Sequence, residues 1–208
     1  MGEDFPWFAS ELQGKLQPYV ELNERQLAEL YAHFQLLMLW NSKINLTSIR
    51  KPADIVVRHY CESLFFAANM PDAPGSTSFA DIGSGAGFPG VPMAILRPDW
   101  RVTLVESHQR KAVFLRESSR GLTNVVVAAK RAEELDLHFD WLVSRAVAPN
   151  DVLSLVPKMS ARVGLLVGTG DFGVLKRDGR FVWTPPISVP WGDNRLCVYA
   201  VSRETSLS

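Results

Sequence analysis

Apolar residues recur at steps of three and four positions after Asn23, which is the spacing of one buried face of an α-helix. These positions are Leu27, Leu30, Tyr31, Phe34, Leu37, Met38 and Ile44. Asn23 suits the N-cap, because its side-chain oxygen can accept a free backbone N–H of the first turn. Pro52 disfavours helix at Lys51, and a second helical run follows at 54–69, "DIVVRHYCESLFFAAN". The pattern therefore predicts an N-terminal helical cap over residues 1–70.

The periodicity changes after the turn-rich stretch 70–78, where short β-branched or apolar runs begin to alternate with amphipathic segments. Alternation of this kind predicts right-handed crossovers and a mostly parallel sheet with helices on both faces. The expected strands lie at 78–83, 101–107, 123–129, 139–146 and 163–168, and the expected helices at 89–97, 108–120 and 150–160.

Two last apolar runs, at 180–189 and 195–203, follow each other without a helix between them. They predict an antiparallel hairpin that closes one edge of the sheet. We therefore expect an α/β chain in which a Rossmann-like domain at 71–208 forms one globule with the helical cap.

Composition and charge change this picture little. Of the 208 residues, 47% are hydrophobic and 21% charged, which is typical of a globular chain with one substantial core. The formal net charge is zero, so a polyanionic partner would have to bind a local basic patch. Cys61 and Cys197 lie far apart, and we expect buried free thiols rather than a disulfide. Acids near the N-terminus, and no apolar run approaching about 20 residues, predict a cytoplasmic protein without a secretory signal or membrane span.

The stretch "FADIGSGAGFPGVP", residues 79–92, holds the first candidate chemistry. Gly83, Gly85 and Gly87 follow the first expected strand, and ligands of open parallel sheets bind beyond the carboxyl ends of the strands. Glycine permits positive φ and lets a ligand approach the main chain. We therefore expect a ligand cradle, in which a side chain at position 83 would invade the ligand's space.

Two cofactors compete for this loop. Gly85, Gly87 and Gly90 match the G-x-G-x-x-G dinucleotide pattern, and Glu106 ends the second expected strand, where an acid can hold a ribose hydroxyl. This pattern alone does not exclude a nicotinamide cofactor, because such a cofactor and S-adenosylmethionine both contain a ribose.

The residues around the glycines favour a ligand with little negative charge. A pyrophosphate requires free N–H donors, and Pro89 and Pro92 remove two of them, while Asp81 adds a carboxylate nearby. S-adenosylmethionine carries a sulfonium, an ammonium, one carboxylate and no phosphate, and Asp81 would act on it through bridging water. The string "DIGSGAG" followed by a second-strand acid resembles the first two motifs of the seven-stranded class I methyltransferases.

Longer strings extend the resemblance. The segments "LWNSKINLTSIR", "VVRHYCESL", "DIGSGAGFPGVPMAI", "RPDWRVTLVESHQRKAVFLRE" and "VSRAV" resemble the bacterial ribosomal RNA small subunit methyltransferase G family, also called glucose-inhibited division protein B. The resemblance runs from about Leu27 to Ala200, and its most specific piece is "GFPGVP". It implies a seven-stranded class I fold and methyl transfer from S-adenosylmethionine to N7 of a guanine in 16S ribosomal RNA.

The resemblance also implies cofactor contacts for Gly83 and Phe88, for Ala132 and Glu133 after the third strand, and for Arg145 after the fourth. Arg145 would sit beside the methyl donor and hold a carboxylate, a phosphate or the target base, and the competing interpretation is a surface ion pair. With the loop residues, the predicted cofactor-binding set is Asp81, Gly83, Gly85, Gly87, Phe88, Glu106, Ala132, Glu133 and Arg145.

Two positions depart from the family pattern. Glu62 stands where the family has aspartate, which lengthens the arm and keeps the charge, and we expect it to be tolerated. Val167 stands where relatives usually carry lysine, so an RNA contact through that lysine is not expected here.

Guanine N7 already presents a lone pair, so no catalytic general base and no metal are expected, and catalysis would be mainly proximity and alignment. RNA hides its major-groove edge in the A-form helix, so the target should be a loop or flipped nucleotide. Phe88 is a candidate stacking surface or a packing residue. Basic residues near the expected pocket would contact the phosphate backbone. The predicted RNA-binding set is Arg58, His59, Lys111, Arg116 and Arg145.

The expected partner is 16S ribosomal RNA in the small ribosomal subunit or its assembly intermediate, and we expect a monomer. Three alternatives to this function remain at this point. The first is a class I methyltransferase that acts on another RNA, a protein or a small molecule. The second is an NAD-dependent oxidoreductase, and the third is a non-catalytic ribosome-assembly factor.

Overall fold

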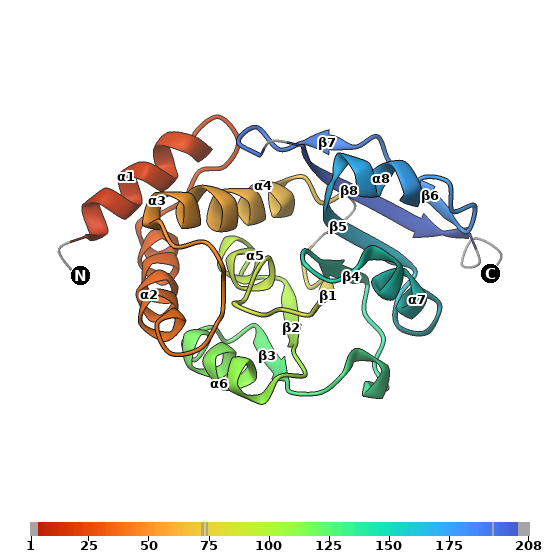
Figure 1. The fold of residues 1–208 in the computed structure, drawn as a ribbon, viewed down its shortest axis with the longest axis horizontal. Coiled ribbons are helices and arrows are strands. Elements are labelled where there is room, and N and C mark those ends of the chain that lie inside the picture. Colours follow the sequence, from red (N-terminus) through yellow and green to blue (C-terminus); the bar gives the residue numbers. More distant parts are fainter. Residues whose placement is uncertain (1–3, 72, 74, 193, 204–208) are drawn as a thin grey trace.

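A computed structural model describes residues 4–71, 73, 75–192 and 194–203 of the chain (Figure 1). Its centre is an eight-stranded sheet in the order β3-β2-β1-β4-β5-β8-β6, with β7 pairing with β8. The strands are β1 (Ser78–Ile82), β2 (Arg101–Val105), β3 (Val125–Ala128), β4 (Trp141–Ser144), β5 (Arg162–Gly168), β6 (Phe181–Trp183), β7 (Ile187–Ser188) and β8 (Arg195–Ser202).

The first five strands are parallel, which confirms the sequence-based prediction of strands at these five places. The strand order reverses between β1 and β4, because β2 and β3 extend the sheet one way from β1 while β4 and β5 extend it the other way. Loops that leave the sheet at such a switch point diverge and open a crevice at the carboxyl ends of the strands. Arg145 is the first residue beyond β4, at the carboxyl end of that strand.

The antiparallel edge is confirmed, with one difference. β8 pairs antiparallel with β5 and with β6, but the single strand expected at 180–189 is divided into β6 and β7, both paired to β8. Pro185 and Pro186 lie between them, and proline supplies no N–H for a strand ladder. Helix α8 (Thr169–Leu175) was not predicted, because two glycines weaken its helical signal.

Helices cover the two faces of the sheet with separate groups. The helices are α1 (Phe5–Leu16), α2 (Glu24–Asn41), α3 (Pro52–Ile55), the π-helix η1 (Val56–Cys61), α4 (Glu62–Ala68), α5 (Gly90–Leu96), α6 (Gln109–Ser118), the 3₁₀ turn η2 (Ala132–Glu134), α7 (Pro149–Met159) and α8. In Figure 1 helices α2 and α4 lie beside α5, α2 also lies beside α6, and the red α1 lies on the outside of this group, whereas α7 and α8 lie near β4, β5 and β8. None of the described helices is both long enough and apolar enough to cross a membrane.

The N-terminal segment is helical as predicted. Asn23 caps α2: its Oδ1 accepts the Gln26 N–H at 2.9 Å while the Gln26 side chain accepts the Asn23 N–H at 3.0 Å, a reciprocal capping box. The second helical run begins at Pro52 and continues through α3, η1 and α4. Its middle is a π-helix, a form that is rare in proteins overall but is often found at functional sites.

Two apolar clusters form the core, one on each face of the sheet. The larger joins α1, α2, η1, α4, α5 and α6 to the sheet, and it includes Phe8, Tyr60 and Phe114. The smaller lies between the sheet, α7 and α8. Because the N-terminal helices and the sheet bury side chains in the same cluster, they meet across an apolar contact. Cys61 and Cys197 are buried free thiols, as expected.

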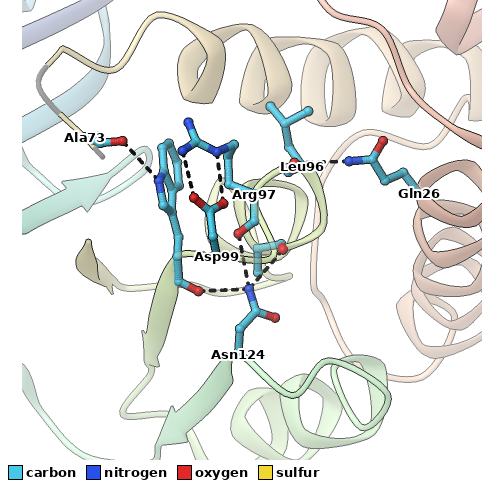
Figure 2. A network of polar contacts seen from close by, with 8 residues as sticks. Gln26, Ala73, Leu96, Arg97, Asp99 and Asn124 are labelled. Carbon is cyan, nitrogen blue, oxygen red and sulfur yellow. Dashed lines mark hydrogen bonds and ion pairs between the residues drawn. The ribbon is translucent and has the colours of Figure 1, made fainter. Parts of the chain in front are cut away.

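Polar side chains fix the connection between α5 and β2 (Figure 2). The Asn124 side-chain amide donates to the carbonyl oxygens of Ala94 and Trp100, both at 3.0 Å, and more weakly to that of Arg97 at 3.4 Å. Gln26 of α2 donates to the carbonyl oxygen of Leu96 at 3.1 Å, so one N-terminal helix satisfies the exposed end of α5. Figure 2 shows both amides converging on this turn from different elements.

We predict that Asn124→Ala lowers the free energy of unfolding by about 1–3 kcal/mol, because it leaves several carbonyl groups without their donor. Urea unfolding measures the change. Asn45→Ala is the matched control, since Asn45 is exposed and its only described side-chain partner is Arg50 at 3.5 Å. Equal losses in the two variants would contradict the prediction.

Candidate active site at the carboxyl ends of the strands

Two cavities meet at the carboxyl ends of β1, β2 and β4. The first, of about 260 Å³, lies between the ends of β2 and β3 and the start of α7, and we call it the β2–β3 cavity. The second, of about 400 Å³, lies between the glycine loop and the N-terminal helices, and we call it the His59 cavity. Gly83, Glu106 and Val147 line both cavities, so these residues form the boundary between them.

The glycine loop has the positive φ angles that the sequence predicted. Gly83, Gly85 and Gly87 have φ of 70°, 56° and 88°. However, the space at Gly83 is limited by the protein itself, because a Cβ there would overlap Cγ2 of Val147. A Cβ on Gly87 would come within 2.7 Å of Val91 Cγ2 and 3.1 Å of His33 Nε2. Glycine is therefore required here for packing as well as for backbone conformation.

Asp81 lies beneath the loop and lines neither cavity. Its side chain is fully buried, and Oδ2 accepts the N–H of Gly90, the first residue of α5, at 3.1 Å. Burial raises the pKa of Asp81 to about 7, and the Gly90 N–H opposes this shift. A carboxylate thus occupies the donor that a pyrophosphate would use in a dinucleotide-binding protein. The water-mediated cofactor contact expected for Asp81 stays a prediction.

Glu106 follows β2 and holds the loop from the other side. Its Oε2 accepts the Gly85 N–H at 3.0 Å, and its Oε1 accepts the His108 N–H at 2.8 Å. Each carboxylate oxygen has two acceptor positions, so each retains one for a ligand hydroxyl. Since Glu106 lines both cavities, the structure places this predicted residue where a ligand that spans them would pass.

Ala132 and Glu133 stand together in η2 and line the β2–β3 cavity. Lys158 of α7 donates from Nζ to the Glu133 carbonyl oxygen at 3.0 Å, and this hydrogen bond links η2 to α7. Asp151 and Ser154 of α7 also line the cavity, and sequence reasoning missed both. Polar side chains on an amphipathic helix normally face solvent, so their pattern carried no signal of a site.

The His59 cavity has an aromatic wall. The His59 ring stacks on Phe88 with centroids 4.6 Å apart and planes 21° apart, and its Nε2 lies 2.8 Å from Thr47 Oγ1. Burial, and then the Arg145 cation, lower the pKa of His59 to about 3. His59 is therefore neutral at pH 7, so its predicted RNA contact would not be an ion pair. Phe88 is 7% exposed and also packs against Tyr60, which gives it a packing role within the cavity wall.

Arg145 enters the same cavity from the end of β4. Its Nη2 lies 3.4 Å from Glu62 Oε2, and Glu62 Oε2 also lies 3.8 Å from Nε of Arg195 on β8. Arg145 Nη1 is buried and has no hydrogen-bond partner among the described residues. Burial lowers the pKa of Arg145 to about 10, and the Glu62 carboxylate opposes this shift, so the guanidinium stays charged at pH 7. The ion pair considered for Arg145 exists, but it is a buried one beside the cavity.

The predicted RNA-binding residues are only partly brought together. Lys111 of α6 is half-buried and lines the His59 cavity with His59 and Arg145, whereas Arg58 and Arg116 are exposed and line neither cavity. Val167, at the place of the family lysine, is buried in the core beside Leu165 and Leu196. Among the described residues, no three His, Cys, Asp or Glu side chains lie close enough to hold a metal ion.

The switch in strand order, the glycine loop after β1 and the acid after β2 define a class I S-adenosylmethionine-dependent methyltransferase fold. The magnesium protoporphyrin IX methyltransferase from Synechocystis PCC 6803, solved with bound S-adenosylmethionine, matches with a TM-score of 0.59 at 13% identity, over 88% of this chain and 99% of that chain. The chain belongs to the rRNA small subunit methyltransferase G family, whose model matches residues 26–170.

Curated relatives agree with this assignment. The ribosomal RNA small subunit methyltransferase G of Roseiflexus sp. (strain RS-1) is 35% identical over 86% of this chain and 84% of the relative. The protein of the same name from Nitrosomonas europaea is 44% identical over 57% of this chain. That second match spans 56% of the relative, little more than half of its length. The family resemblance predicted from the sequence is thereby confirmed.

We predict that Gly83→Ala lowers the free energy of unfolding by about 2–4 kcal/mol, from positive-φ strain and overlap with Val147. Urea unfolding measures this loss. Adding Val147→Ala should recover the part of the unfolding free energy that is lost through overlap, and it should leave the part that is lost through positive-φ strain. Gly173→Ala in α8 is the control, because nothing lies within 4 Å of its added Cβ, and it should be neutral or stabilising. A double variant no more stable than Gly83→Ala would contradict the assigned cause.

Proposed function

We propose that this protein transfers a methyl group from S-adenosylmethionine to N7 of a guanine in 16S ribosomal RNA. Its membership of the rRNA small subunit methyltransferase G family supports the reaction class and the substrate class. One geometric observation carries the proposal further. A cavity suited to a nucleoside and a cavity with aromatic and basic walls meet at Gly83 and Glu106.

The residues of the β2–β3 cavity fit the nucleoside part of S-adenosylmethionine. Glu106 retains acceptor positions for the ribose hydroxyls, and Ala132 and Glu133 stand where an adenine edge would lie. Gly83 lines both cavities, and Val147, which packs over it, lines both as well, so a ligand that spans the cavities would cross at these two residues. When bound, this cofactor supplies an electrophilic methyl group on sulfur.

The residues of the His59 cavity would then align the target base. Guanine N7 has an in-plane lone pair and loses no proton on methylation, so alignment is the main contribution required of the protein. The neutral His59 ring, stacked on Phe88, gives the cavity an aromatic wall, and Arg145 adds a buried donor. A base that enters such a cavity has to leave its stack, which favours a loop or flipped nucleotide.

The Asp81 contact weighs against the NAD-dependent alternative. The N–H of Gly90 donates to the carboxyl group of Asp81, so a pyrophosphate at this place would lose that donor. The cytoplasmic location and the monomeric state stay predictions, as does the division between the N-terminal helical cap and the Rossmann-like domain.

Labelled methyl transfer tests the proposal. Ribosomal RNA and small-subunit particles from cells that lack the enzyme are incubated with the protein and methyl-labelled S-adenosylmethionine, and the modified base is mapped. We expect label on one guanine N7 of 16S RNA. Label on another RNA, a protein or a small molecule would establish the corresponding alternative, and binding without transfer would favour an assembly factor.

We predict that Lys111→Glu weakens RNA binding and flattens its dependence on salt by about one unit of slope, because one phosphate contact is lost. Binding is measured by fluorescence anisotropy across a salt series. Affinity for S-adenosylhomocysteine, the product of the transfer, whose sulfur is uncharged, is measured by calorimetry and should stay close to the native value. Lys176→Glu is the matched control, since Lys176 is exposed after α8 and lines neither cavity. The same slope for the Lys111 variant and the native protein would remove Lys111 from the RNA contact.

A further inference from the structure

Glu62 is a buried acid that lines neither of the two cavities but contacts Arg145, which lines the His59 cavity. It is the first residue of α4, directly after the π-helix that carries His59. Its side chain is 2% exposed and lies within 4 Å of two guanidinium groups, Arg145 at 3.4 Å and Arg195 at 3.8 Å. Three segments distant in sequence, α4, the connection after β4 and β8, therefore meet at one carboxylate.

The charges around Glu62 are otherwise positive. Burial raises its pKa, while Arg145, Arg195 and Arg58 each lower it, so all three cations act on this carboxylate. The His59 cavity itself is lined by Lys111 and Arg145 on the cationic side and by Glu106 on the anionic side. Because Asp81 is fully buried with a pKa of about 7, it is only partly ionised near neutral pH. Glu62 is thus the carboxylate that directly pairs the cavity's arginine.

The net charge beside the His59 cavity matters because the proposed cofactor is a cation at its reacting centre. The sulfonium of S-adenosylmethionine carries a positive charge, whereas the sulfur of the product S-adenosylhomocysteine is neutral. A cavity wall with unpaired guanidinium charge would repel the first and not the second, and such repulsion is strong where water is excluded. The ammonium and carboxylate of the amino-acid end are common to both ligands.

We propose that Glu62, by pairing Arg145 and Arg195, sets the charge of the His59 cavity so that it accepts a sulfonium cation beside a guanidinium group. Glu62 acts through the arginines as a positioning and charge-balancing residue, and it touches neither substrate nor cofactor. The inference rests on the proposed function, because it requires S-adenosylmethionine to be the cofactor. It concerns a residue whose carboxylate is one methylene farther from the backbone than the aspartate of the family pattern.

Calorimetry with two ligands tests the inference. S-adenosylmethionine and S-adenosylhomocysteine are titrated into the native protein and into Glu62→Gln, which keeps the shape of the side chain and removes its charge. We expect the dissociation constant for S-adenosylmethionine to rise about tenfold more than that for S-adenosylhomocysteine. A purely structural loss would weaken both ligands equally, so an unchanged ratio of the two constants would overturn the inference.

Two further variants keep the test decisive if Glu62→Gln folds poorly. Glu62→Asp preserves the charge and should retain the native ratio. Arg195→Gln removes one of the paired cations, and it should shift the ratio two- to threefold toward S-adenosylmethionine, because Glu62 is then less neutralised. A ratio that stays at the native value in Arg195→Gln, or one that shifts the opposite way, would overturn the inference.

The native protein separates this inference from the proposed function. If it binds neither ligand, both the proposed function and the role of Glu62 are wrong. If it binds both ligands and transfers methyl groups, but the ratio is the same in Glu62→Gln, only the role of Glu62 is wrong.

Discussion

The main chain of the glycine loop is packed on both sides, and this constraint determines where the rest of the site lies. Val147, from the connection after β4, covers Gly83, while His33 of α2 and Val91 of α5 crowd Gly87. No side chain fits at either position, so the loop is held between the sheet and the N-terminal helices. The two cavities are the spaces that remain on either side of it.

The protein's own carboxylates accept two backbone N–H groups at this loop, those of Gly85 and Gly90, while others, such as those of Gly83 and Gly87, donate to main-chain carbonyl oxygens. Asp81 accepts from Gly90, and Glu106 accepts from Gly85 and His108. In phosphate-binding loops the corresponding N–H groups remain free for the anion. Here two acids take that place, so the same glycine-rich motif becomes suited to a ligand of little negative charge. The chemistry of the loop is therefore decided by its acids as much as by its glycines.

The sequence predicted the parallel strands and the N-cap at Asn23 because these depend on local patterns that recur along the chain. It did not reveal the pairing of Glu62 with Arg145 and Arg195, since residues far apart in sequence carry no mark of contact. It missed α8 because local glycines weaken the helical signal, and tertiary packing overrides that weakness. The expected reason for glycine at position 83 was also incomplete: the neighbouring Val147, rather than the ligand alone, excludes a side chain.

The N-terminal helices are part of the site and not only a cover over it. His33 packs against Phe88, Thr47 lies at His59, and Glu62 pairs with Arg145, so the helical segment builds one wall of the His59 cavity. The β2–β3 cavity, in contrast, is lined by the sheet ends, η2 and α7. On the proposed function, the cofactor's nucleoside would be held by elements of the common fold, while the target base would meet residues of the helical segment. Substitutions among the helical residues that face the target base would then leave the contacts to the nucleoside in place, whereas Glu62 of the same segment would act on the sulfonium end of the cofactor.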